Sequence, residues 1–376
     1  MNSTSATFRP VLIMAGGTGG HVFPALAVAR QLRDRDIPVV WLGTRRGLES
    51  RVVPQAGLPI AWVSVRGLRG KGVWRVIVAP FMIAWACLQV LVILIRLRPL
   101  AVLGMGGFVS GPGGVMAWLL RRPLLIHEQN SVAGLTNRLL APLARRVMVA
   151  FPGALPARQH PVYTGNPVRE EIAGMADPAT RLTGRHEPMR LLVVGGSLGA
   201  AVLNEIVPGA VQQMEAGQRP ELWHQTGDRQ DGRVREVYRA AGIEGRVEPF
   251  ITDMARAYAW ADLVLCRAGA LTVAELAAVG AGAILVPYPY AVDDHQTSNG
   301  RFLSEAGAAV LLPQGELSVE RLASLLAGFS ADRSRLEDMA RRARELAQPD
   351  AAQKVAQLCL ETAREAKPWY RRKRAS

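Results

Sequence analysis

Residues 13–28 have the sequence IMAGGTGGHVFPALAV. The apolar run that opens this stretch, Val11–Met14, is typical of a buried strand, and the segment after the glycines is typical of a helix. A glycine-rich turn from a strand into a helix presents backbone N–H groups at the positive end of the helix dipole, where phosphate binds. The stretch therefore predicts an α/β fold with an anion site, and His21 stands at the end of that turn.

The first glycine loop matches neither of the common nucleotide motifs. The dinucleotide pattern G-x-G-x-x-G needs a glycine where Val22 stands, and the Gly-Lys-Ser/Thr of a P-loop is absent. A second loop, Gly195–Gly199, and a third glycine-rich stretch, Gly104–Gly114, also follow strand-like runs. Each could be a tight turn that binds nothing, but three of them favour a large phosphate-bearing ligand set over NAD or ATP.

Strand-like runs alternate with helical segments along the whole chain, which predicts parallel sheets covered by helices on both faces. The expected strands are Val11–Met14, Val39–Leu42, Ala61–Val65, Ala101–Leu103, Leu124–Ile126, Val147–Ala150, Arg190–Val194, Leu222–Gln225, Val247–Phe250, Leu263–Cys266, Ala283–Val286 and Ala309–Leu312.

The second half opens like the first, since LLVVGGSLGAAVLNEIV from Leu191 echoes VLIMAGGTGGHVFPALAV. We therefore expect two doubly wound domains, residues 8–166 and 167–349, with the boundary in the sequence YTGNPVREEI. The helix expected over residues 350–367 packs back on the first domain, and residues 368–376 form a basic tail. The ligand is expected in the cleft between the domains, at the carboxyl ends of the strands.

Composition narrows the class of protein. Three widely spaced cysteines, Cys87, Cys266 and Cys359, predict buried small side chains and no disulfide framework. The N-terminus lacks the basic start and apolar core of a signal peptide, so we expect a cytoplasmic chain. A formal net charge of +14 suits an anionic partner: nucleic acid, anionic lipid or a phosphorylated substrate.

Two segments bear on membranes. Val76–Ile95 is apolar and long enough to span a bilayer, but it lies between two strand-like runs, which favours a crossover helix with an exposed apolar patch. A true membrane span is the alternative. The tail, KPWYRRKRAS, places aromatic residues beside basic ones and suits an anionic lipid surface, with a solvated disordered tail as the alternative.

Polar clusters follow three of the expected strands. HEQN (residues 127–130) follows Leu124–Ile126 and is expected to line the cleft. In CRAGALTVAELAAVG (residues 266–280) we expect Glu275 in the first helical turn, where a carboxylate can accept both hydroxyls of a ribose. The cluster in AVDDHQTSNG (residues 291–300) could suggest a metal site, but no cysteine or second pair of His and carboxylate supports it. The triplet Asp34–Asp36 imitates an Asp-x-Asp motif but lies at the far end of the first expected helix, so no metal is expected.

Together these motifs resemble one family, the bacterial undecaprenyldiphospho-muramoylpentapeptide β-N-acetylglucosaminyltransferases. The segments that carry the resemblance, in order over nearly the whole chain, are GGTGGHVFPALAVA, WLGT, GLRGKG, GMGGFVSGPGG, HEQNSVAGLTNR, TGNPVR, VVGGSLGA, YAWADLVLCRAGALTVAELAAVG and DDHQTSNG. The resemblance implies the GT-B fold, two Rossmann-like domains with the last helix returning to the first. Phe108, Tyr290 and Gly300 depart from the residues common in the family, and Phe108 excludes a catalytic phenol at that position.

The resemblance implies an inverting transfer of N-acetylglucosamine from UDP-N-acetylglucosamine to the muramoyl C4 hydroxyl of lipid I, giving lipid II and UDP in peptidoglycan synthesis. It implies no cofactor or metal, and a peripheral position on the cytoplasmic face of the inner membrane. Anionic phospholipid and other proteins of cell-wall synthesis, cell shape and cell division are the implied partners, and nucleic acid is not.

The resemblance also assigns residues. The implied donor contacts are Thr18, Gly19, Gly20, Asn130, Arg169, Ser197, Ile251, Ala270, Leu271, Thr272, Val273, Ala274, Glu275 and Gln296. In this assignment Ile251 meets uracil, Glu275 the ribose and Gln296 the sugar, while Ser197 and the amides of residues 270–272 meet the diphosphate. Further candidates for acceptor contacts or auxiliary roles are His127, Asn204, Arg267 and Asn299.

The transfer needs a base for the acceptor hydroxyl and a group that stabilises the leaving diphosphate. His21 is the favoured base because an imidazole titrates near neutral pH, and Glu128 is the alternative. Helix N-termini and Arg169 suit the leaving charge. A UDP-N-acetylglucosamine 2-epimerase, a membrane transporter and a basic nucleic-acid binder are the rival classes.

Overall fold

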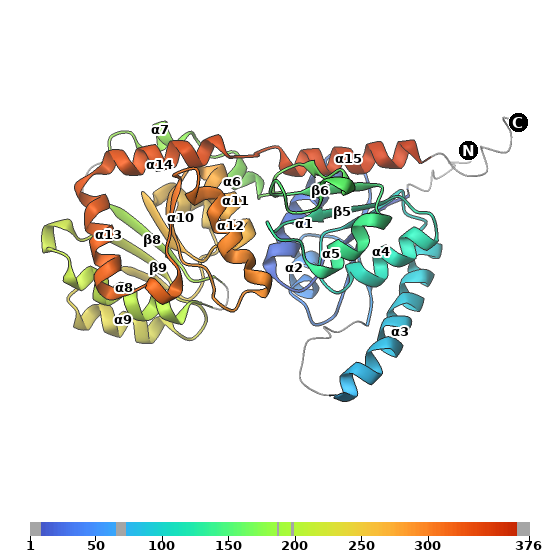
Figure 1. Ribbon diagram of the computed structural model, residues 1–376, viewed down its shortest axis with the longest axis horizontal. Helices are drawn as coiled ribbons and strands as arrows, with labels where there is room; N and C mark the ends of the chain where they lie inside the picture. Colours follow the sequence, from blue (N-terminus) through green and yellow to red (C-terminus); the bar gives the residue numbers. More distant parts are fainter. Residues whose placement is uncertain (1–8, 65–72, 186–187, 197–198, 367–376) are drawn as a thin grey trace, which may run out of the picture. The chain divides into compact units, whose positions relative to one another are not determined.

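The computed structural model describes residues 9–64, 73–185, 188–196 and 199–366. The chain forms two compact units: unit 1 is Met1–Arg169 with Asp350–Ser376, and unit 2 is Glu170–Pro349. Each unit is a parallel sheet with helices on both faces, as the sequence predicted (Figure 1). The division between the units falls after Arg169, whereas the sequence placed it after Asn166.

Unit 1 contains a seven-stranded sheet in the order β3-β2-β1-β4-β5-β6-β7. Its strands are β1 (Val11–Met14), β2 (Val39–Gly43), β3 (Ile60–Trp62), β4 (Ala101–Gly104), β5 (Leu124–Glu128), β6 (Arg146–Val149) and β7 (Val162–Tyr163). Its helices are α1 (Gly19–Arg33), α2 (Glu49–Gln55), α3 (Val73–Leu97), α4 (Ser110–Leu119), α5 (Leu135–Leu140) and α15 (Ala351–Glu365), with short 3-10 turns η1 (Ala141–Leu143) and η2 (Ala157–Gln159).

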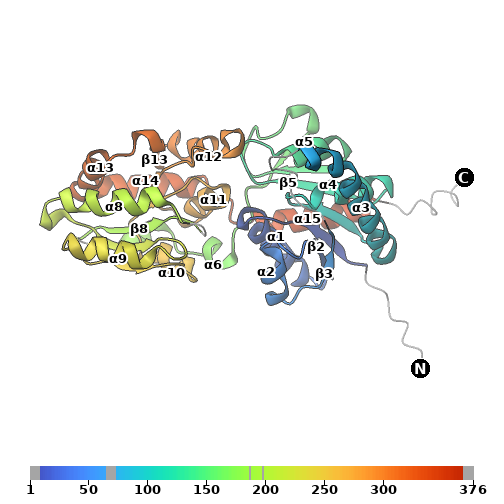
Figure 2. The same ribbon diagram turned by 90° about the horizontal axis from the view of Figure 1, so that it is seen from below.

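The central strand β1 explains how unit 1 buries both faces of its sheet. Successive side chains of a strand point to opposite faces, and all four residues of β1 are buried. Val11 and Ile13 join the core that α1 and α15 cover, whereas Leu12 and Met14 join the core beneath α3. The last helix, α15, therefore completes unit 1 by packing on α1 and β4 (Figure 2).

Unit 2 contains a six-stranded parallel sheet in the order β10-β9-β8-β11-β12-β13. Its strands are β8 (Arg190–Val194), β9 (Glu221–Gln225), β10 (Arg246–Glu248), β11 (Leu263–Cys266), β12 (Gly282–Leu285) and β13 (Ala309–Leu311). Its helices are α6 (Glu170–Ala173), α7 (Pro178–Leu182), α8 (Ala201–Gln213), α9 (Asp231–Ala240), α10 (Met254–Trp260), α11 (Ala270–Val279), α12 (His295–Ser304), α13 (Val319–Ala331) and α14 (Arg333–Glu345), with 3-10 turns η3 (Ala216–Gln218), η4 (Val292–Asp294) and η5 (Gln314–Glu316).

Every strand expected from the sequence is present: β1, β8 and β11 have the expected bounds, and the ends of the other expected strands move by one to three residues. The largest differences are at β10, which ends at Glu248 instead of Phe250, at β3, which ends at Trp62 (residue 65 of the expected strand lies outside the described residues), and at β5, which continues to Glu128. His127 and Glu128, expected to follow that strand, are therefore its last two residues. The sequence prediction missed β7, because two residues are too few to show a period.

The strand order reverses between β1 and β4 in unit 1 and between β8 and β11 in unit 2. At such a switch point the two neighbouring loops leave the sheet in opposite directions, and ligands bind there at the carboxyl ends of the strands. The first and third glycine-rich stretches flank the switch point of unit 1, since they follow β1 and β4. The second follows β8 at the switch point of unit 2.

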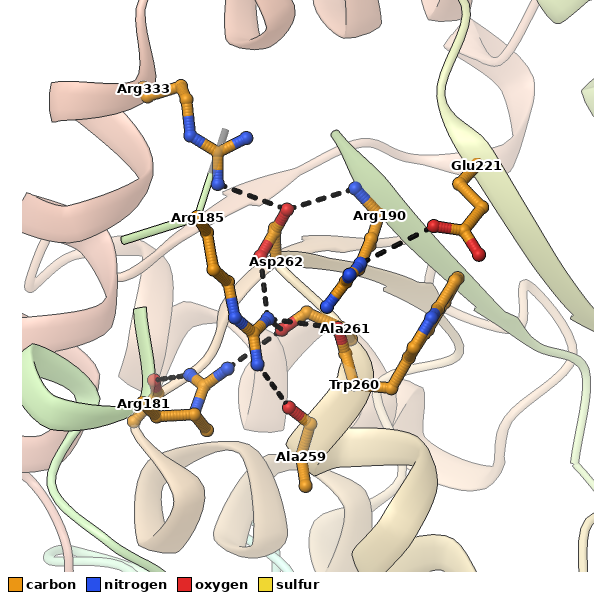
Figure 3. Close-up of polar contacts among 10 residues, drawn as sticks. Arg181, Arg185, Arg190, Glu221, Ala259, Trp260, Ala261, Asp262 and Arg333 are labelled. Carbon is orange, nitrogen blue, oxygen red and sulfur yellow. Dashed lines mark hydrogen bonds and ion pairs between the residues drawn. The ribbon is translucent and has the colours of Figure 1, made fainter. Parts of the chain in front are cut away.

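An ion cluster at the amino ends of β8 and β11 ties unit 2 together (Figure 3). Asp262, 1% exposed, accepts from Arg185 Nη1 at 2.7 Å, from Arg333 Nη2 at 3.1 Å and from the backbone N–H of Arg190 at 3.0 Å. Arg181 lies beside this cluster, where burial and the nearby Arg185 lower its pKa to about 10 although Asp262 opposes the change. The cluster links β8, β11 and α14 with both carboxylate oxygens of Asp262 engaged.

The long apolar helix α3 follows β3 and precedes β4, in the position of a crossover helix. Residues 78–97 of α3 are, among the described helices, the one stretch long and apolar enough to cross a membrane. Ala86, Val90 and Leu94, spaced by four, are fully buried and pack into the core of unit 1. This stripe makes α3 part of the fold of unit 1 along one side, while its other side stays exposed.

The three cysteines do not share one environment. Cys266 and Cys359 are buried, and burial raises the pKa of each thiol to about 12, which keeps it protonated and unreactive. Cys87, on α3, is only half-buried. The expectation of three buried cysteines is therefore wrong for Cys87, because it lies outside the buried stripe of α3.

Candidate functional site

Thr18 begins helix α1 and leaves its hydroxyl group open. It is the N-cap residue, with extended backbone angles (φ −99°, ψ 165°), yet its side chain makes no capping hydrogen bond and is exposed. Gly19 and Gly20 form the first turn and are half-buried. A helix N-terminus with small residues and an uncommitted hydroxyl is suited to an anion or a sugar hydroxyl.

The buried carboxylate of Glu49 holds the first glycine loop, and sequence reasoning missed it. Its Oε2 accepts from the backbone N–H of Gly17 at 3.1 Å, and its Oε1 accepts from Thr44 N at 3.0 Å and Thr44 Oγ1 at 2.7 Å. The N–H of Gly17 is thus bonded within the protein. Anion binding at this loop must therefore use the first turn of α1 rather than that N–H group.

The loop after β4 packs directly on the loop after β1. Gly107 has φ +83°, and a Cβ there would lie 2.3 Å from the carbonyl oxygen of Gly16. Gly106 has φ +94°, and its Cβ would lie 2.8 Å from the imidazole of His21. Both positions require glycine, in conformation and in space. The third glycine-rich stretch therefore forms one wall against which the His21 ring packs.

His21 is connected to a buried polar chain, here named the histidine–glutamine network (His21, Gln129, His127 and the carbonyl of Gly165). His21 Nδ1 lies 3.0 Å from Gln129 Oε1, Gln129 Nε2 lies 3.2 Å from His127 Nδ1, and His127 Nε2 lies 3.0 Å from Gly165 O. The network joins residues at or just after the carboxyl ends of β1, β5 and β7. His21 itself is half-buried, whereas Gln129 and His127 are 1% and 0% exposed.

The HEQN segment is buried rather than lining an open surface. His127, Glu128 and Gln129 are all closed to solvent, and only Asn130 is half-buried. The expectation that all four line a cleft is therefore wrong for the first three. The strand continues to Glu128, so its alternation sends His127 and Gln129 to one side and Glu128 to the other.

Both oxygens of Glu128 are occupied by its own loop and by α5. Its Oε1 accepts from Asn130 N at 2.9 Å and Nδ2 at 3.2 Å, and its Oε2 accepts from Gly134 N at 3.1 Å and Asn137 Nδ2 at 2.8 Å. Four donors on a carboxylate 1% exposed make it a clamp for the loop between β5 and α5. This geometry favours His21 over Glu128 as the base.

In unit 2, Glu275 lies in the second turn of α11, not in the first turn as expected, since the helix already begins at Ala270. It is 5% exposed, and its Oε2 accepts a hydrogen bond from the phenol of Tyr258 on α10 at 3.0 Å. Tyr258 is a second residue that sequence reasoning missed. Because Tyr258 orients one oxygen of the carboxylate, the direction of Glu275 is fixed by protein contacts.

The N-terminus of α11 resembles that of α1. Gly269 is the N-cap with no side-chain capping bond, and Thr272 stands half-buried in the first turn. Of the neighbouring candidates, Leu271 and Ala274 are half-buried, while Ala270 and Val273 are 7% and 0% exposed. Residues 270–274 can therefore offer a ligand mainly backbone N–H groups and the Thr272 hydroxyl.

Three further candidates in unit 2 hold the backbone around the carboxyl ends of β11 and β12. Gln296 Oε1 accepts from Tyr288 N at 2.9 Å, and Arg267 Nη1 donates to the carbonyls of residues 286 and 287, each at 3.2 Å. Burial lowers the pKa of Arg267. Asn299, fully buried, donates to the carbonyl of residue 268 at 3.3 Å.

The remaining candidates have separate environments. Asn204 is 7% exposed and donates to Thr226 O at 3.1 Å while accepting from His224 Nε2 at 3.1 Å, so it supports the loop after β9. Ile251 is 2% exposed, which leaves its backbone rather than its side chain for a ligand. Arg169 stacks on Phe23 of α1 at 5.9 Å. Ser197 lies outside the described residues.

Among the described residues, no group of three or more His, Cys, Asp or Glu side chains is placed to hold a metal ion. Asp293 and Asp294, in the polar segment after β12, both have positive φ and point from an exposed 3-10 turn. These two residues therefore belong to an exposed turn.

The chain forms two Rossmann-like units, and candidate residues of each unit lie at glycine-rich helix N-termini. This arrangement, with the matching family models, defines a glycosyltransferase of the GT-B class. The chain belongs to glycosyltransferase family 28: the N-terminal domain of that family matches residues 11–149 and its C-terminal domain matches residues 190–355.

Individual relatives are similar over nearly their whole length. The chain is 61% identical over 355 residues, 94% of this chain and 99% of the other, to a UDP-N-acetylglucosamine–N-acetylmuramyl-(pentapeptide) pyrophosphoryl-undecaprenol N-acetylglucosamine transferase of Alkalilimnicola ehrlichii. It is 58% identical over 353 residues (94% and 98%) to the protein of the same name from Nitrosococcus oceani. A crystal structure of Acinetobacter baumannii MurG matches with a TM-score of 0.81 and 43% identity, covering 94% of this chain and 99% of that one.

Proposed function

We propose that this enzyme transfers N-acetylglucosamine from UDP-N-acetylglucosamine to undecaprenyl-diphospho-N-acetylmuramoyl-pentapeptide (lipid I), releasing UDP and giving lipid II for peptidoglycan synthesis. Relatives that share 61% and 58% of their residues with it carry this activity in their names. The observation that carries the mechanism is the position of His21 at the start of α1, with one ring nitrogen bonded to a buried network. An alcohol acceptor needs such a base.

The reaction is a displacement at the anomeric carbon of the donor sugar. The C4 hydroxyl oxygen of the acceptor forms the new bond, the bond from the anomeric carbon to the diphosphate oxygen breaks, and its electron pair leaves on UDP. The proton of the hydroxyl passes to His21. Attack from the side opposite the leaving group inverts the anomeric centre, as we expect for this transfer.

Unit 2 supplies most of the donor contacts in this proposal. Glu275, oriented by Tyr258, accepts the ribose hydroxyls, and the backbone near Ile251 meets the uracil. The open N-terminus of α11, with Gly269 as N-cap and the hydroxyl of Thr272, holds the diphosphate. Gln296 meets the sugar, and contacts are added by Thr18, Gly19, Gly20, Asn130, Arg169, Ser197, Ala270, Leu271, Val273 and Ala274.

The leaving diphosphate gains negative charge as the bond breaks. The dipole at the start of α11 carries positive partial charge, and the guanidinium of Arg169 can add a full charge and paired hydrogen bonds. Together with the α1 N-terminus these groups supply the electrostatic stabilisation that a divalent cation supplies in other transferases. We therefore propose a metal-independent reaction, which a chelator does not slow.

We further propose that unit 1 docks on the cytoplasmic face of the inner membrane through an apolar surface on α3, α4 and α5. Helices α3 and α4 pack together, as do α4 and α5. The exposed large side chains of this surface are Val78, Phe81, Ile83, Trp85, Leu88, Val92, Ile95, Val115, Trp118, Leu119, Leu135 and Leu139. Phe81 is 74% exposed and Trp85 is 56% exposed, so they are the strongest anchors.

Basic side chains border this surface. Arg96, Arg98 and Arg121 are exposed near the ends of α3 and α4, where they can attract anionic headgroups at about 1 kcal/mol each. Peripheral contact suits a lipid-linked acceptor, because the acceptor's sugar lies just above the bilayer surface. Partner proteins of cell-wall synthesis and cell division would meet the enzyme at the same membrane.

Transfer of labelled N-acetylglucosamine to a soluble lipid I analogue tests the proposed reaction. We expect labelled disaccharide product in equal yield with and without a chelator. Incubation with UDP-N-acetylglucosamine alone should leave the sugar unchanged. Appearance of the 2-epimer without acceptor would support the epimerase alternative instead, and loss of transfer with chelator would contradict the metal-independent mechanism.

The donor assignment is tested by UDP affinity. Replacing Glu275 with alanine removes the proposed ribose acceptor, so we expect calorimetric UDP binding at least about tenfold weaker, the cost of a charged hydrogen bond. Tyr258→Phe removes only the orienting phenol and should weaken binding less. Unchanged UDP affinity in Glu275→Ala would refute the ribose role.

Membrane docking is tested by co-sedimentation with vesicles. Vesicles rich in phosphatidylglycerol should bind the wild-type enzyme, and Phe81→Ser/Trp85→Ser should reduce binding at least tenfold through lost apolar burial. Activity on the soluble acceptor analogue should stay unchanged. Retention of the wild-type enzyme after alkaline carbonate extraction would favour a membrane span, the transporter-like alternative.

A further inference from the structure

In the histidine–glutamine network, the donor and the acceptor of each hydrogen bond are fixed, and the carbonyl of Gly165 sets this order. A carbonyl oxygen only accepts hydrogen bonds, so the Nε2 of His127, 3.0 Å away, must carry a proton. Complete burial lowers the pKa of His127 to about 4, so its imidazole is neutral near pH 7. A neutral imidazole has one proton, and its Nδ1 is therefore an acceptor.

The orientation of the Gln129 amide follows from two independent acceptors. Its Nε2 lies 3.2 Å from His127 Nδ1 and 3.2 Å from the carbonyl oxygen of His127, with Met105 Sδ at 4.0 Å. Each of these groups can accept a hydrogen bond but cannot donate one, so the NH₂ end of Gln129 must face them. Its oxygen, Oε1, consequently faces His21 Nδ1 at 3.0 Å.

The contact with Gln129 fixes the tautomer of His21. Because an amide oxygen can only accept, the Nδ1 of His21 must donate its proton to Gln129. The neutral ring then has its lone pair on Nε2, and among the described residues no side chain or backbone group bonds that atom. Gly106 leaves room for the ring and would clash with it if it carried a Cβ, so the ring is also confined sterically.

We propose that Gln129 and His127 are positioning residues that hold His21 in the Nδ1–H tautomer and thereby leave Nε2 free to take the acceptor's proton. This inference rests on the proposed function, in which His21 is the base. When Nε2 takes the proton from the C4 hydroxyl, Nδ1 keeps its own proton and Gln129 Oε1 goes on accepting from it. The same contact therefore orients the base and stabilises the imidazolium.

The neutrality of the network suits this task. A carboxylate at position 129 would attract the imidazolium more strongly, but one of its oxygens would then face the lone pairs of His127 Nδ1 and His127 O. An amide presents a donor to one side and an acceptor to the other. Gln129 can therefore donate to His127 and accept from His21, in the order that the carbonyl of Gly165 sets. Glutamine is therefore the side chain that both neighbours require.

The tautomer can be read directly from the ¹⁵N chemical shifts of the His21 ring in protein labelled at histidine. In the wild-type enzyme with a neutral His21 ring, we expect Nδ1 to show the signal of a protonated nitrogen and Nε2 that of an unprotonated one. His21→Ala assigns the signals. The reverse pattern in the wild-type enzyme, with the proton on Nε2, would overturn the inference without any further variant.

A near-isosteric variant tests the positioning role. Gln129→Met keeps the volume of the side chain but removes its hydrogen bonds to His21 and His127, so the Nδ1–H preference should be lost and kcat should fall about 10- to 100-fold, a typical cost of losing an orienting group. The KM for UDP-N-acetylglucosamine should stay within about twofold. Gln357→Ala, at an exposed glutamine of the same unit, is the matched control and should change neither quantity.

The outcomes separate this inference from the proposed function. A wild-type enzyme that transfers N-acetylglucosamine but has its His21 proton on Nε2 keeps the function and loses the inference. An enzyme with the Nδ1–H signature but no transfer to lipid I keeps the tautomer assignment and the orienting role of Gln129, but loses the proposed function and with it the role of His21 as the base. A folded Gln129→Met variant with unchanged tautomer and unchanged kcat would show that Gln129 only packs.

Discussion

The two units place buried polar networks at opposite ends of their sheets. In unit 1 the histidine–glutamine network lies at the carboxyl ends of β1, β5 and β7, and its members are neutral amide, imidazole and carbonyl groups. In unit 2 the ion cluster around Asp262 lies at the amino ends of β8 and β11, and its members are a carboxylate and guanidinium groups (Figure 3). The first network ends on an open imidazole nitrogen, whereas in the second both oxygens of the buried carboxylate are engaged.

The difference between the two networks indicates that the ion cluster of unit 2 serves stability, whereas the neutral network of unit 1 serves reactivity. A closed buried ion cluster has both carboxylate oxygens engaged, so it can only hold elements together, and removing one charge leaves others uncompensated. A neutral network with one open end costs less to bury and can pass its orientation to a reacting atom. In parallel α/β sheets, ligands bind at the carboxyl ends of the strands, and the open network lies at that end.

The largest expected effect is that of His21→Ala on turnover. Loss of a general base costs about 10²- to 10⁴-fold, so kcat at saturating substrates should fall by that factor. His21 is half-buried and makes one side-chain hydrogen bond, so the free energy of unfolding should change by about 1 kcal/mol or less. Turnover within a few-fold of the wild type would show that His21 is not the base.

The opposite pattern is expected for Asp262→Asn. The half-buried guanidinium groups of Arg185 and Arg333 lose the buried carboxylate that balances their charge, so the free energy of unfolding should fall by about 3–5 kcal/mol, with kcat unchanged below the unfolding range. Glu221→Gln is the matched control, since the pair between Arg190 and Glu221 is exposed and should contribute less than about 1 kcal/mol. Equal effects of the two variants in denaturant titrations would contradict the role of the cluster.

The smallest effect is a loss of stability in weak acid. The pKa of His127 is lowered from 6.5 to about 4 in the folded chain, so the unfolded chain binds the proton first as pH falls. The contribution of His127 to the free energy of unfolding is complete above pH 6.5. It is lost as pH falls toward 4, at about 1.4 kcal/mol per pH unit. Between pH 7.5 and 5.5 the free energy of unfolding should therefore drop by about 1 kcal/mol from His127.

The comparison for this prediction is His127→Gln, measured by urea unfolding at the two pH values. Its drop should be smaller than that of the wild-type chain by the His127 contribution. His224 keeps its own share in both proteins, because burial lowers its pKa to about 3. An equal drop in both proteins would mean that His127 is not held neutral.

The fold could be predicted from the sequence because its signals are local. Short apolar runs predicted the strands, and glycine turns placed the helices that follow β1 and β8. His21 was found in the same way, as an unusual residue in a recognisable turn. Strand ends were less certain, and the two extra residues of β5 turned HEQN from an expected open loop into a buried strand end.

The missed residues depend on contacts between distant segments. Glu49 acts on Gly17, 32 positions away, and Tyr258 acts on Glu275 from another helix. Neither carries a local motif, so only the folded chain brings the partners together. One signal was available: had the strand been extended to Gln129, its period of two would have placed His127 and Gln129 on the same side.

The central claim, that the network of unit 1 acts through His21, is tested most directly by a double-mutant cycle on kcat. We predict that Gln129→Met lowers kcat about 10- to 100-fold in the wild-type background but within about twofold in the His21→Ala background, because no base remains to be oriented. Folding of all four proteins is checked by their unfolding transitions. Equal losses in both backgrounds would contradict the account, since Gln129 would then act independently of His21.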